Sequence, residues 1–179
     1  ALSSAASDVY KRQFIFMVGN AIAQSAQPII SYNFGRKEKH RTRETEKIAI
    51  LTALLCGITV TAVFSLFPRF MVGLFIDSDN TAARIAIDGF PYFATGFIAF
   101  IFNLTAVGYF QSVERIKPAT LFALSRGFLL LIPSFLLAPQ WLGTPGIWLA
   151  MPIAETLTAI AVILFYFYVR RKERKSRSF

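Results

Sequence analysis

Five long apolar segments constrain the fold of this chain more than any other feature of its sequence. Each is 19 to 23 residues long, and they cover residues 14–32, 48–68, 89–110, 118–138 and 147–169. At about 1.5 Å of rise per residue, a helix of this length reaches roughly 30 Å, the thickness of the hydrocarbon core of a bilayer. The sequence therefore predicts an all-α fold, a polytopic membrane bundle of five transmembrane helices over residues 14–169.

Charged residues are scarce and lie mostly between these segments. Of all residues, 55% are hydrophobic and 16% are charged, whereas an ordinary soluble domain is roughly 45 to 50% apolar. The first three segments contain no charge, the fourth contains only Arg126, and the fifth contains only Glu155. We therefore expect the lipid bilayer to be the partner of most of this surface.

The basic residues predict how the bundle is oriented. Six Lys or Arg residues fall in 36–47 and six in 170–177, directly beside apolar segments. Because cytoplasmic loops are enriched in Lys and Arg, we expect a multi-pass protein of the plasma (inner) membrane whose basic tail, 170–179, is cytoplasmic. This placement argues against a nucleic-acid partner despite the net charge of +9, and it makes contact with anionic lipid an additional expectation.

Residues 1–13 differ in composition from the remainder of the chain. This segment is small and polar, and its last six letters, DVYKRQ, are what a transposase end sequence used in DNA library preparation would encode. We interpret residues 1–13 as a leader that is either non-native, a sequencing scar, or disordered. Five spans and a cytoplasmic C-terminus also place the start of the first span outside, so we expect an N-terminal part to be missing.

Two ionisable residues lie inside the expected spans. Placing such a side chain in the membrane costs about 2.5 to 3.5 kcal/mol on insertion scales, so residues of this kind are functional candidates by default. Arg126 lies eight residues into its span from the expected cytoplasmic end, and Glu155 lies eight residues into its span from the expected outer end. We therefore expect them at different depths and not directly paired unless a helix is kinked. Glu155 fits a packing carboxyl and a proton- or substrate-linked role equally well, whereas Arg126 is expected to clamp loop carbonyls or a carboxylate near the cytoplasmic face.

Polar and proline residues supply further candidates. The first span carries a ladder of polar side chains that can either join helices by hydrogen bonds or line a water-filled cavity: Asn20, Gln24, Gln27, Ser31 and Asn33. Prolines interrupt three spans at Pro28, Pro133 and Pro152, and Pro133, the deepest, is the hinge candidate. No enzyme motif is present, so no catalytic residue is assigned, and a single Cys56 with a single loop His40 predicts no metal site.

Three stretches carry a family resemblance. GNAIAQSAQPIISYNFGRKE (19–38), GYFQSVERIKPATLFALSRG (108–127) and GIWLAMPIAE (146–155) resemble, in order, segments of MATE (multidrug and toxic compound extrusion) transporters, the MepA-like branch in particular. Residues matching the family motifs are Gln27, Pro28, Tyr32, Asn33, Gly35, Gln111, Arg126, Pro152 and Glu155. The resemblance implies spans eight to twelve of a twelve-span protein, the larger part of its C-terminal six-helix lobe.

The resemblance also implies a function. Such transporters export small amphipathic cations by proton or sodium antiport, alternating between two states around a cavity between their lobes. The implied partners are these cations and the missing N-terminal lobe, with no cofactor beyond the coupling ion. Sodium-coupled members carry a carboxylate in the tenth helix, which the segment 89–110 lacks; this favours protons or places coupling in the missing lobe. Two alternatives stay open, a lipid-linked oligosaccharide flippase of the same superfamily and a non-transporting membrane scaffold.

The interpretation of the leader can be checked directly. If residues 1–13 are a scar, the native locus upstream of Phe14 lacks the codons for DVYKRQ. Sequencing that locus is the measurement, and an unbroken native reading of DVYKRQ would contradict the interpretation.

Overall fold

The computed structural model describes residues 2–73 and 81–175, and this part of the chain is built from helices joined by short turns, without a strand. The all-α bundle expected from the sequence is confirmed. In chain order the elements are α1 (Leu2–Gly35), α2 (Lys39–Leu66), α3 (Pro68–Gly73), α4 (Thr81–Ala94), α5 (Phe97–Ser112), α6 (Ile116–Leu124), the π-helical turn η1 (Ser125–Leu129), α7 (Leu131–Leu142) and α8 (Thr144–Lys175).

Each expected span corresponds to helix, but the boundaries differ. Three of the described helical stretches are long and apolar enough to cross a membrane, 39–66, 116–142 and 144–171, and a fourth is formed if α4 and α5, bent by 52° at a short break, count as one span. α1 is not among the stretches found within the described residues. α1 begins at Leu2 and so includes residues 2–13 of the expected leader, and α8 carries the expected tail as helix through Lys175.

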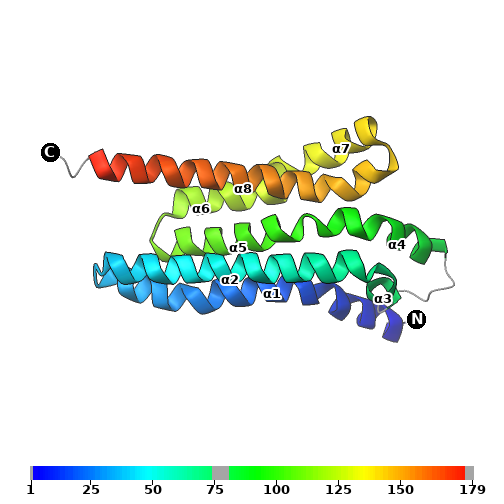
Figure 1. Ribbon diagram of the computed structural model, residues 1–179, viewed down its shortest axis with the longest axis horizontal. Helices are drawn as coiled ribbons and strands as arrows, with labels where there is room; N and C mark the ends of the chain where they lie inside the picture. The colour runs from blue at the N-terminus through cyan, green and yellow to red at the C-terminus, as the bar shows by residue number, and fades with distance from the viewer. Residues whose placement is uncertain (1, 74–80, 176–179) are drawn as a thin grey trace.

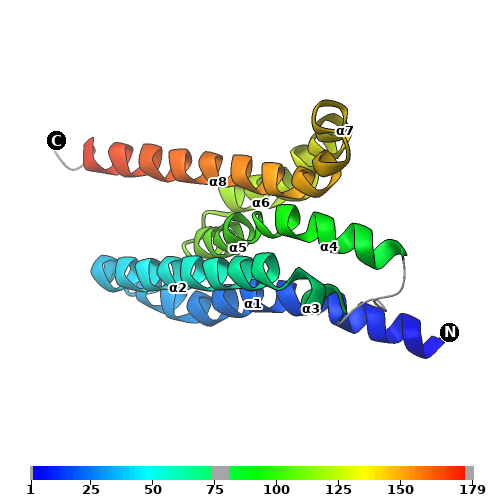
Figure 2. The ribbon, with the colours of Figure 1, turned by 45° about the vertical axis from the view of Figure 1, so that its right-hand side comes forward.

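Helix α5 lies at the centre of the bundle. It packs against α1 and α2 on one side and against α6 and α8 on the other, while α7 packs on α8. Figures 1 and 2 show these helices running roughly along one axis, with α7 turned away from it. Any side chain that must touch several helices at once is therefore best placed on α5.

Two aromatic clusters pack around α5, one near each end. Towards its N-terminus, the rings of Phe64 and Phe97 meet edge to face at 5.3 Å. Towards its C-terminus, Phe110 contacts Phe122 and Phe165, with ring centroids 5.7 Å apart in each pair. Such pairs prefer offset or edge-to-face geometry because the ring face is electron-rich and the edge is not. The clusters hold α2, α5, α6 and α8 together and leave a middle layer between them.

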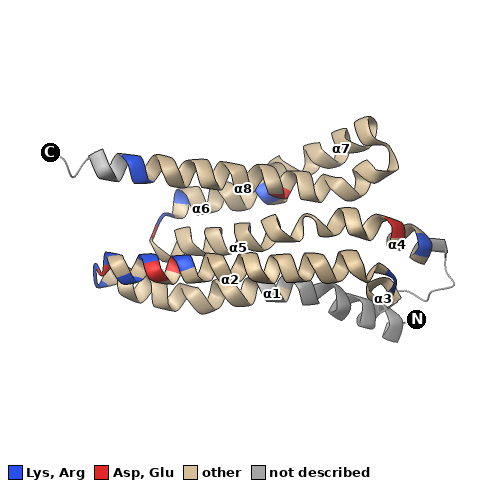
Figure 3. Ribbon diagram, viewed as in Figure 1, with Lys and Arg blue, Asp and Glu red and all other residues tan. Residues whose placement is uncertain are grey.

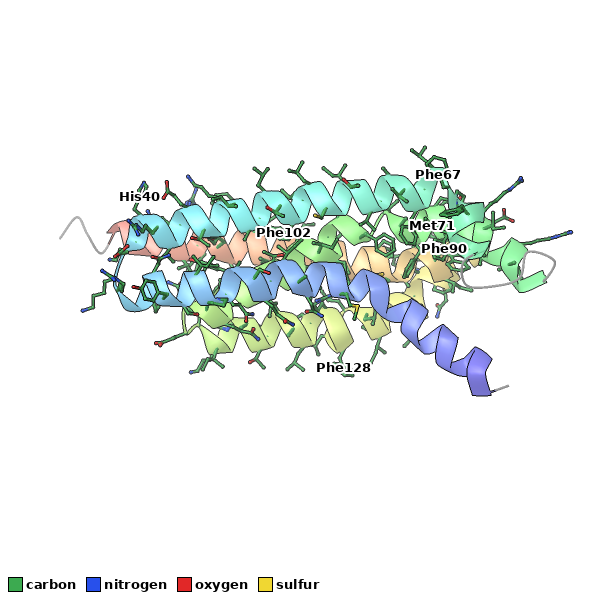
Figure 4. The ribbon with its side chains drawn as sticks, turned by 90° about the horizontal axis from the view of Figure 1, so that it is seen from below. His40, Phe67, Met71, Phe90, Phe102 and Phe128 are labelled. Atoms are coloured by element: carbon green, nitrogen blue, oxygen red, sulfur yellow. The ribbon has the colours of Figure 1, made fainter. Side chains whose placement is uncertain are left out.

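The outer surface of the bundle is apolar, the reverse of a soluble protein. On α2, the large side chains of Ile48, Leu51, Leu55 and Ile58 are exposed. The buried face of the same helix is mostly small, with Ala49, Ala53 and Gly57 among its members. Small residues let helix backbones approach closely, and large apolar ones face lipid at little cost. Figure 4 shows such side chains projecting outward along the bundle, Phe128 among them.

The three basic segments lie at one end of the bundle. Figure 3 places the α1–α2 turn, the α5–α6 turn and the C-terminal end of α8 together there, with the charged residues of α3 and α4 at the opposite end. In Figure 4, His40 marks the basic end, and Phe67, Met71 and Phe90 lie towards the other. A shared end is what the basic-loop pattern requires. Which side of the membrane this end faces stays a prediction.

The break between α4 and α5 fits closely against α8. A Cβ added at Gly96 would lie 2.9 Å from Cα of Pro152 and 3.1 Å from its ring. Real Cβ atoms essentially never come that close to backbone, so only glycine permits this approach. Pro152, one of the three prolines noted in the sequence, is buried at this contact and fixes where the bend in the α4–α5 pair meets α8.

Replacing Gly96 by Ala should therefore destabilise the bundle. The added methyl group must push α8 away from the break, a change that typically costs about 1 to 3 kcal/mol. The measurement is the thermal unfolding midpoint of the full-length protein in detergent. Gly35→Ala is the matched control, because a Cβ there meets nothing within 4 Å. Equal midpoints for the two variants would contradict the prediction.

Candidate functional site

A buried ion pair between Arg126 and Glu155 occupies the middle layer of the bundle. Oε1 of Glu155 accepts two hydrogen bonds from the guanidinium, from Nε at 3.1 Å and from Nη2 at 2.9 Å. The side chains are only 12% and 5% exposed. Figure 3 shows the two charges side by side, well away from the other coloured residues. From the sequence we expected direct pairing only if a helix is kinked; in the structure the pair is formed.

The π-helical turn η1 accounts for the pairing. Leu130 N–H donates to the carbonyl of Ser125 at 2.8 Å, a five-residue hydrogen bond that inserts one extra residue into the helix. Pro133 follows just after, and its ring excludes the carbonyl four residues earlier, that of Leu129, from regular α-helical geometry. The wide turn and the long Arg126 side chain together close the gap to Glu155. Pro133 remains the hinge candidate, next to this irregular turn.

Helix α5 completes the site with two side chains one turn apart. Asn103 donates through Nδ2 to Oε2 of Glu155 at 2.8 Å and to the backbone carbonyl of the same residue at 2.8 Å. The ring of Phe100 lies under the guanidinium, whose carbon is 4.5 Å from the ring centroid. A cation over an aromatic face is stabilised by about 2 kcal/mol when desolvated. The site thus joins α5, η1 and α8.

One atom of the site is left without a partner. Oδ1 of Asn103 is buried and accepts no hydrogen bond within the part of the chain that the structure describes. Asn103 itself is fully buried. Buried polar atoms without a partner are rare and usually mark either strain or a functional group. The amide therefore has one free acceptor directly beside the buried carboxylate.

Part of the polar ladder of α1 makes hydrogen bonds within the bundle. Gln27 donates to Oε1 of Gln111 on α5 at 3.2 Å, and Ser31 donates to the carbonyl of Ser112 at 3.3 Å. Asn33 is buried and donates to the carbonyl of Ile29 in its own helix at 2.9 Å. Gln27, Ser31 and Asn33 therefore make hydrogen bonds within the bundle. Of the others, Asn20 is half-buried and Gln24 is exposed.

The remaining motif residues of α1 lie near the basic end, away from the ion pair. The hydroxyl of Tyr32 accepts a hydrogen bond from Nη1 of Arg36 at 2.8 Å. Gly35 is the last residue of α1, and Pro28 is exposed within it. Tyr32 and Gly35 therefore belong to the helix end, and Pro28 to the exposed face of α1.

Sequence reasoning missed Asn103 and a second buried carboxylate, that of Glu46. Asn103 could have been found, since it is the only amide or charged residue within the apolar segment 89–110. Glu46 was hidden because it lies in a basic stretch just before the second expected span, yet it is 2% exposed and 3.9 Å from Nη2 of Arg170. Only the packing of α2 near the end of α8 reveals its burial. Among the described residues, no group of His, Cys, Asp or Glu side chains could hold a metal ion.

Comparison with known proteins supplies a family. A family model described as MatE matches residues 12–137. The Multidrug export protein MepA of Staphylococcus saprophyticus is 26% identical over 165 residues, covering 88% of this chain and 34% of the relative. MepA of Staphylococcus haemolyticus is 22% identical over 171 residues, covering 89% and 35% respectively. The chain thus spans about a third of the length of these relatives, and no solved structure matches it.

A double-mutant cycle tests whether the ion pair acts as a unit. Arg126→Met alone leaves Glu155 without its cation and should lower the free energy of unfolding by about 3 to 5 kcal/mol, and Glu155→Leu alone should do likewise. The double variant should lose much less free energy of unfolding than the two single variants added together, because it buries no unpaired charge. Denaturant unfolding of the full-length protein in detergent measures all three.

The control for this cycle is the exposed His40–Glu44 pair, 3.3 Å apart. Glu44→Gln should change the free energy of unfolding by less than about 1 kcal/mol, since exposed pairs contribute little. Strictly additive losses at Arg126 and Glu155 would show that the two side chains are not coupled.

Proposed function

We propose, since the chain belongs to the MatE family, that it forms part of a secondary active exporter of small amphipathic cations. Export is driven by antiport of protons, or of sodium, across the plasma membrane. The residues of this chain supply five helical segments of the C-terminal lobe, and the N-terminal lobe of the same protein completes the substrate cavity. The MepA relatives, named as multidrug export proteins, support this proposal.

The buried Arg126–Glu155 pair with Asn103 is the observation that carries the proposal. A carboxylate and a guanidinium are expensive inside a lipid-surrounded bundle, and apolar residues of similar size are often at least as stabilising there. Charges retained at such a position are functional candidates in their own right. The location of Arg126 on a π-helical turn supports a role in movement, because such turns are frequent at functional sites.

Glu155 is the proposed coupling group, and Arg126 is its partner in the state described. When the α6–α7 segment straightens at η1, Arg126 leaves the carboxylate, which then takes up a proton because an unpaired buried charge is costly. Asn103 can serve both states. Its amide group donates to the carboxylate now, and after a flip its Oδ1 can accept the proton of the neutral acid. In the described state Arg126 has a second partner in Phe100, through a cation–π contact.

Coupling of this kind makes the two conformations depend on the protonation of one group. The proton binds the state in which Arg126 has moved, and the cation to be exported favours the state in which the pair is formed. A ligand shifts such an equilibrium only by its difference in affinity for the two states. Loss of the carboxylate therefore removes the coupling and leaves the fold in one preferred state.

The test is export by the full-length gene in an efflux-deficient host. Glu155→Gln, at an unchanged amount of protein in the membrane, should reduce uncoupler-sensitive ethidium export at least tenfold, because the amide cannot exchange a proton. Glu44→Gln removes a carboxylate that is exposed at the bundle end and should leave export at the wild-type level.

Export by the wild-type gene that ignores an uncoupler would count against proton antiport, and repeating the assay with a collapsed sodium gradient then distinguishes the coupling ion. Normal export by Glu155→Gln would restrict the ion pair to a packing role and withdraw the mechanism.

A further inference from the structure

A cavity of about 710 Å³ opens at the basic end of the bundle, between the α1–α2 turn and the α5–α6 turn. Four cationic side chains line it, from Lys37, Lys39, Arg43 and Arg115, against the single carboxylate of Glu114. A concentration of positive charge around a hollow of this size suits an anion. The ion pair at the middle of the bundle uses none of these residues.

The acidic residues nearest in sequence do not neutralise the cavity. Glu38 bonds to its neighbours Arg36 at 3.0 Å and Arg41 at 3.2 Å. Within the described part of the chain, Lys37 and Lys39 have no carboxylate at ion-pair distance. The charges of Lys37 and Lys39 are therefore not neutralised by ion pairs within the described part of the chain.

The backbone holds two of the lining residues in an unfavourable conformation. Lys37 and Glu114 have φ values of 61° and 58°, and each follows the end of its helix in a Schellman motif, a position that usually takes glycine. The bonds that define the two motifs run from Glu38 N–H to Asn33 and from Arg115 N–H to Phe110. A left-handed conformation is costly for residues with a side chain. At both turns the residue that adopts this unfavourable conformation, Lys37 or Glu114, has a side chain that lines the cavity.

The lining also includes apolar groups, which distinguishes the cavity from a site for a fully hydrated anion. Phe34 and Val113 contribute to its wall. Tyr32 and Phe34, both on the last turn of α1, are 62% and 40% exposed, and aromatic residues at helix ends are typical of the membrane interface. Cations beside apolar surface at this level match a molecule with an anionic head and an apolar body.

We propose that this cavity binds the headgroup of an anionic phospholipid from the leaflet at the basic end of the bundle. Lys37, Lys39 and Arg43 hold the phosphate, and the acyl chains begin against Phe34 and Val113. Basic pockets of this kind at a helix end recognise headgroups by charge and attract lipid from within the bilayer. The lipid then bridges the α1–α2 and α5–α6 turns, a role independent of the transport mechanism.

Direct binding to the full-length protein in detergent tests the proposal, with dioctanoyl phosphatidylglycerol as the probe and dioctanoyl phosphatidylcholine and inorganic phosphate as comparison ligands. The double variant Lys37→Gln/Lys39→Gln should weaken phosphatidylglycerol binding about thirtyfold, because each basic side chain near an anionic surface contributes roughly fivefold. The matched control, Lys47→Gln/Arg171→Gln, removes two exposed charges from the same end that do not line the cavity and should change affinity less than about threefold.

Glu114→Gln supplies a result that misfolding cannot imitate, since removal of the single lining carboxylate should tighten phosphatidylglycerol binding several-fold. Equal weakening in the double variant and its control would overturn the proposal in favour of general surface charge. It is also overturned if the wild-type protein fails to prefer phosphatidylglycerol over phosphatidylcholine. Inorganic phosphate that displaces the lipid at equal concentration would assign the cavity to a soluble anion instead.

Discussion

A charge buried where water cannot reach it must be paired, and this requirement organises the centre of the bundle. Arg126 and Glu155 meet this requirement by pairing with each other. From α5, Asn103 adds a hydrogen bond to the carboxylate and Phe100 adds a cation–π contact to the guanidinium. Because the partners come from three elements, the pair fixes how α5, η1 and α8 lie against one another. Aromatic clusters pack on either side of it along α5, which leaves the polar layer enclosed by rings.

Close helix packing depends on small residues in the interior, since lipid supplies no hydrophobic drive for helices to associate. Gly96 lies against Pro152, and a Cβ at Gly108 would come 3.2 Å from that of Ala23. These contacts bring α5 near α8 on one side and α1 on the other. Near the α1 contact, Gln27 reaches Gln111. The same close approach that permits dispersion contacts thus also permits hydrogen bonds between helices.

The residues of the candidate site could be predicted only in part from the sequence. The cost of a charge in lipid singled out Arg126 and Glu155 without any structure, and Gln27 and Gln111 matched family motifs. Their pairings were not readable, because a π-helical turn changes the direction of every side chain after it and its position follows from Pro133 and from packing. Asn103 was overlooked although its segment holds no other amide. The burial of Glu46 could not be predicted, since nothing in the basic sequence around it indicates that this carboxylate faces the interior of the bundle.

Segment length, apolar content and the clustering of Lys and Arg determined by themselves that this chain is a helical membrane bundle with one basic end, because the bilayer imposes length and charge rules on each segment separately. The bend between α4 and α5, the ion pair and the cavity between two turns were decided only by the tertiary structure. Each of these features depends on contacts between segments far apart in the chain, and the sequence of one segment does not indicate which other segment it will contact.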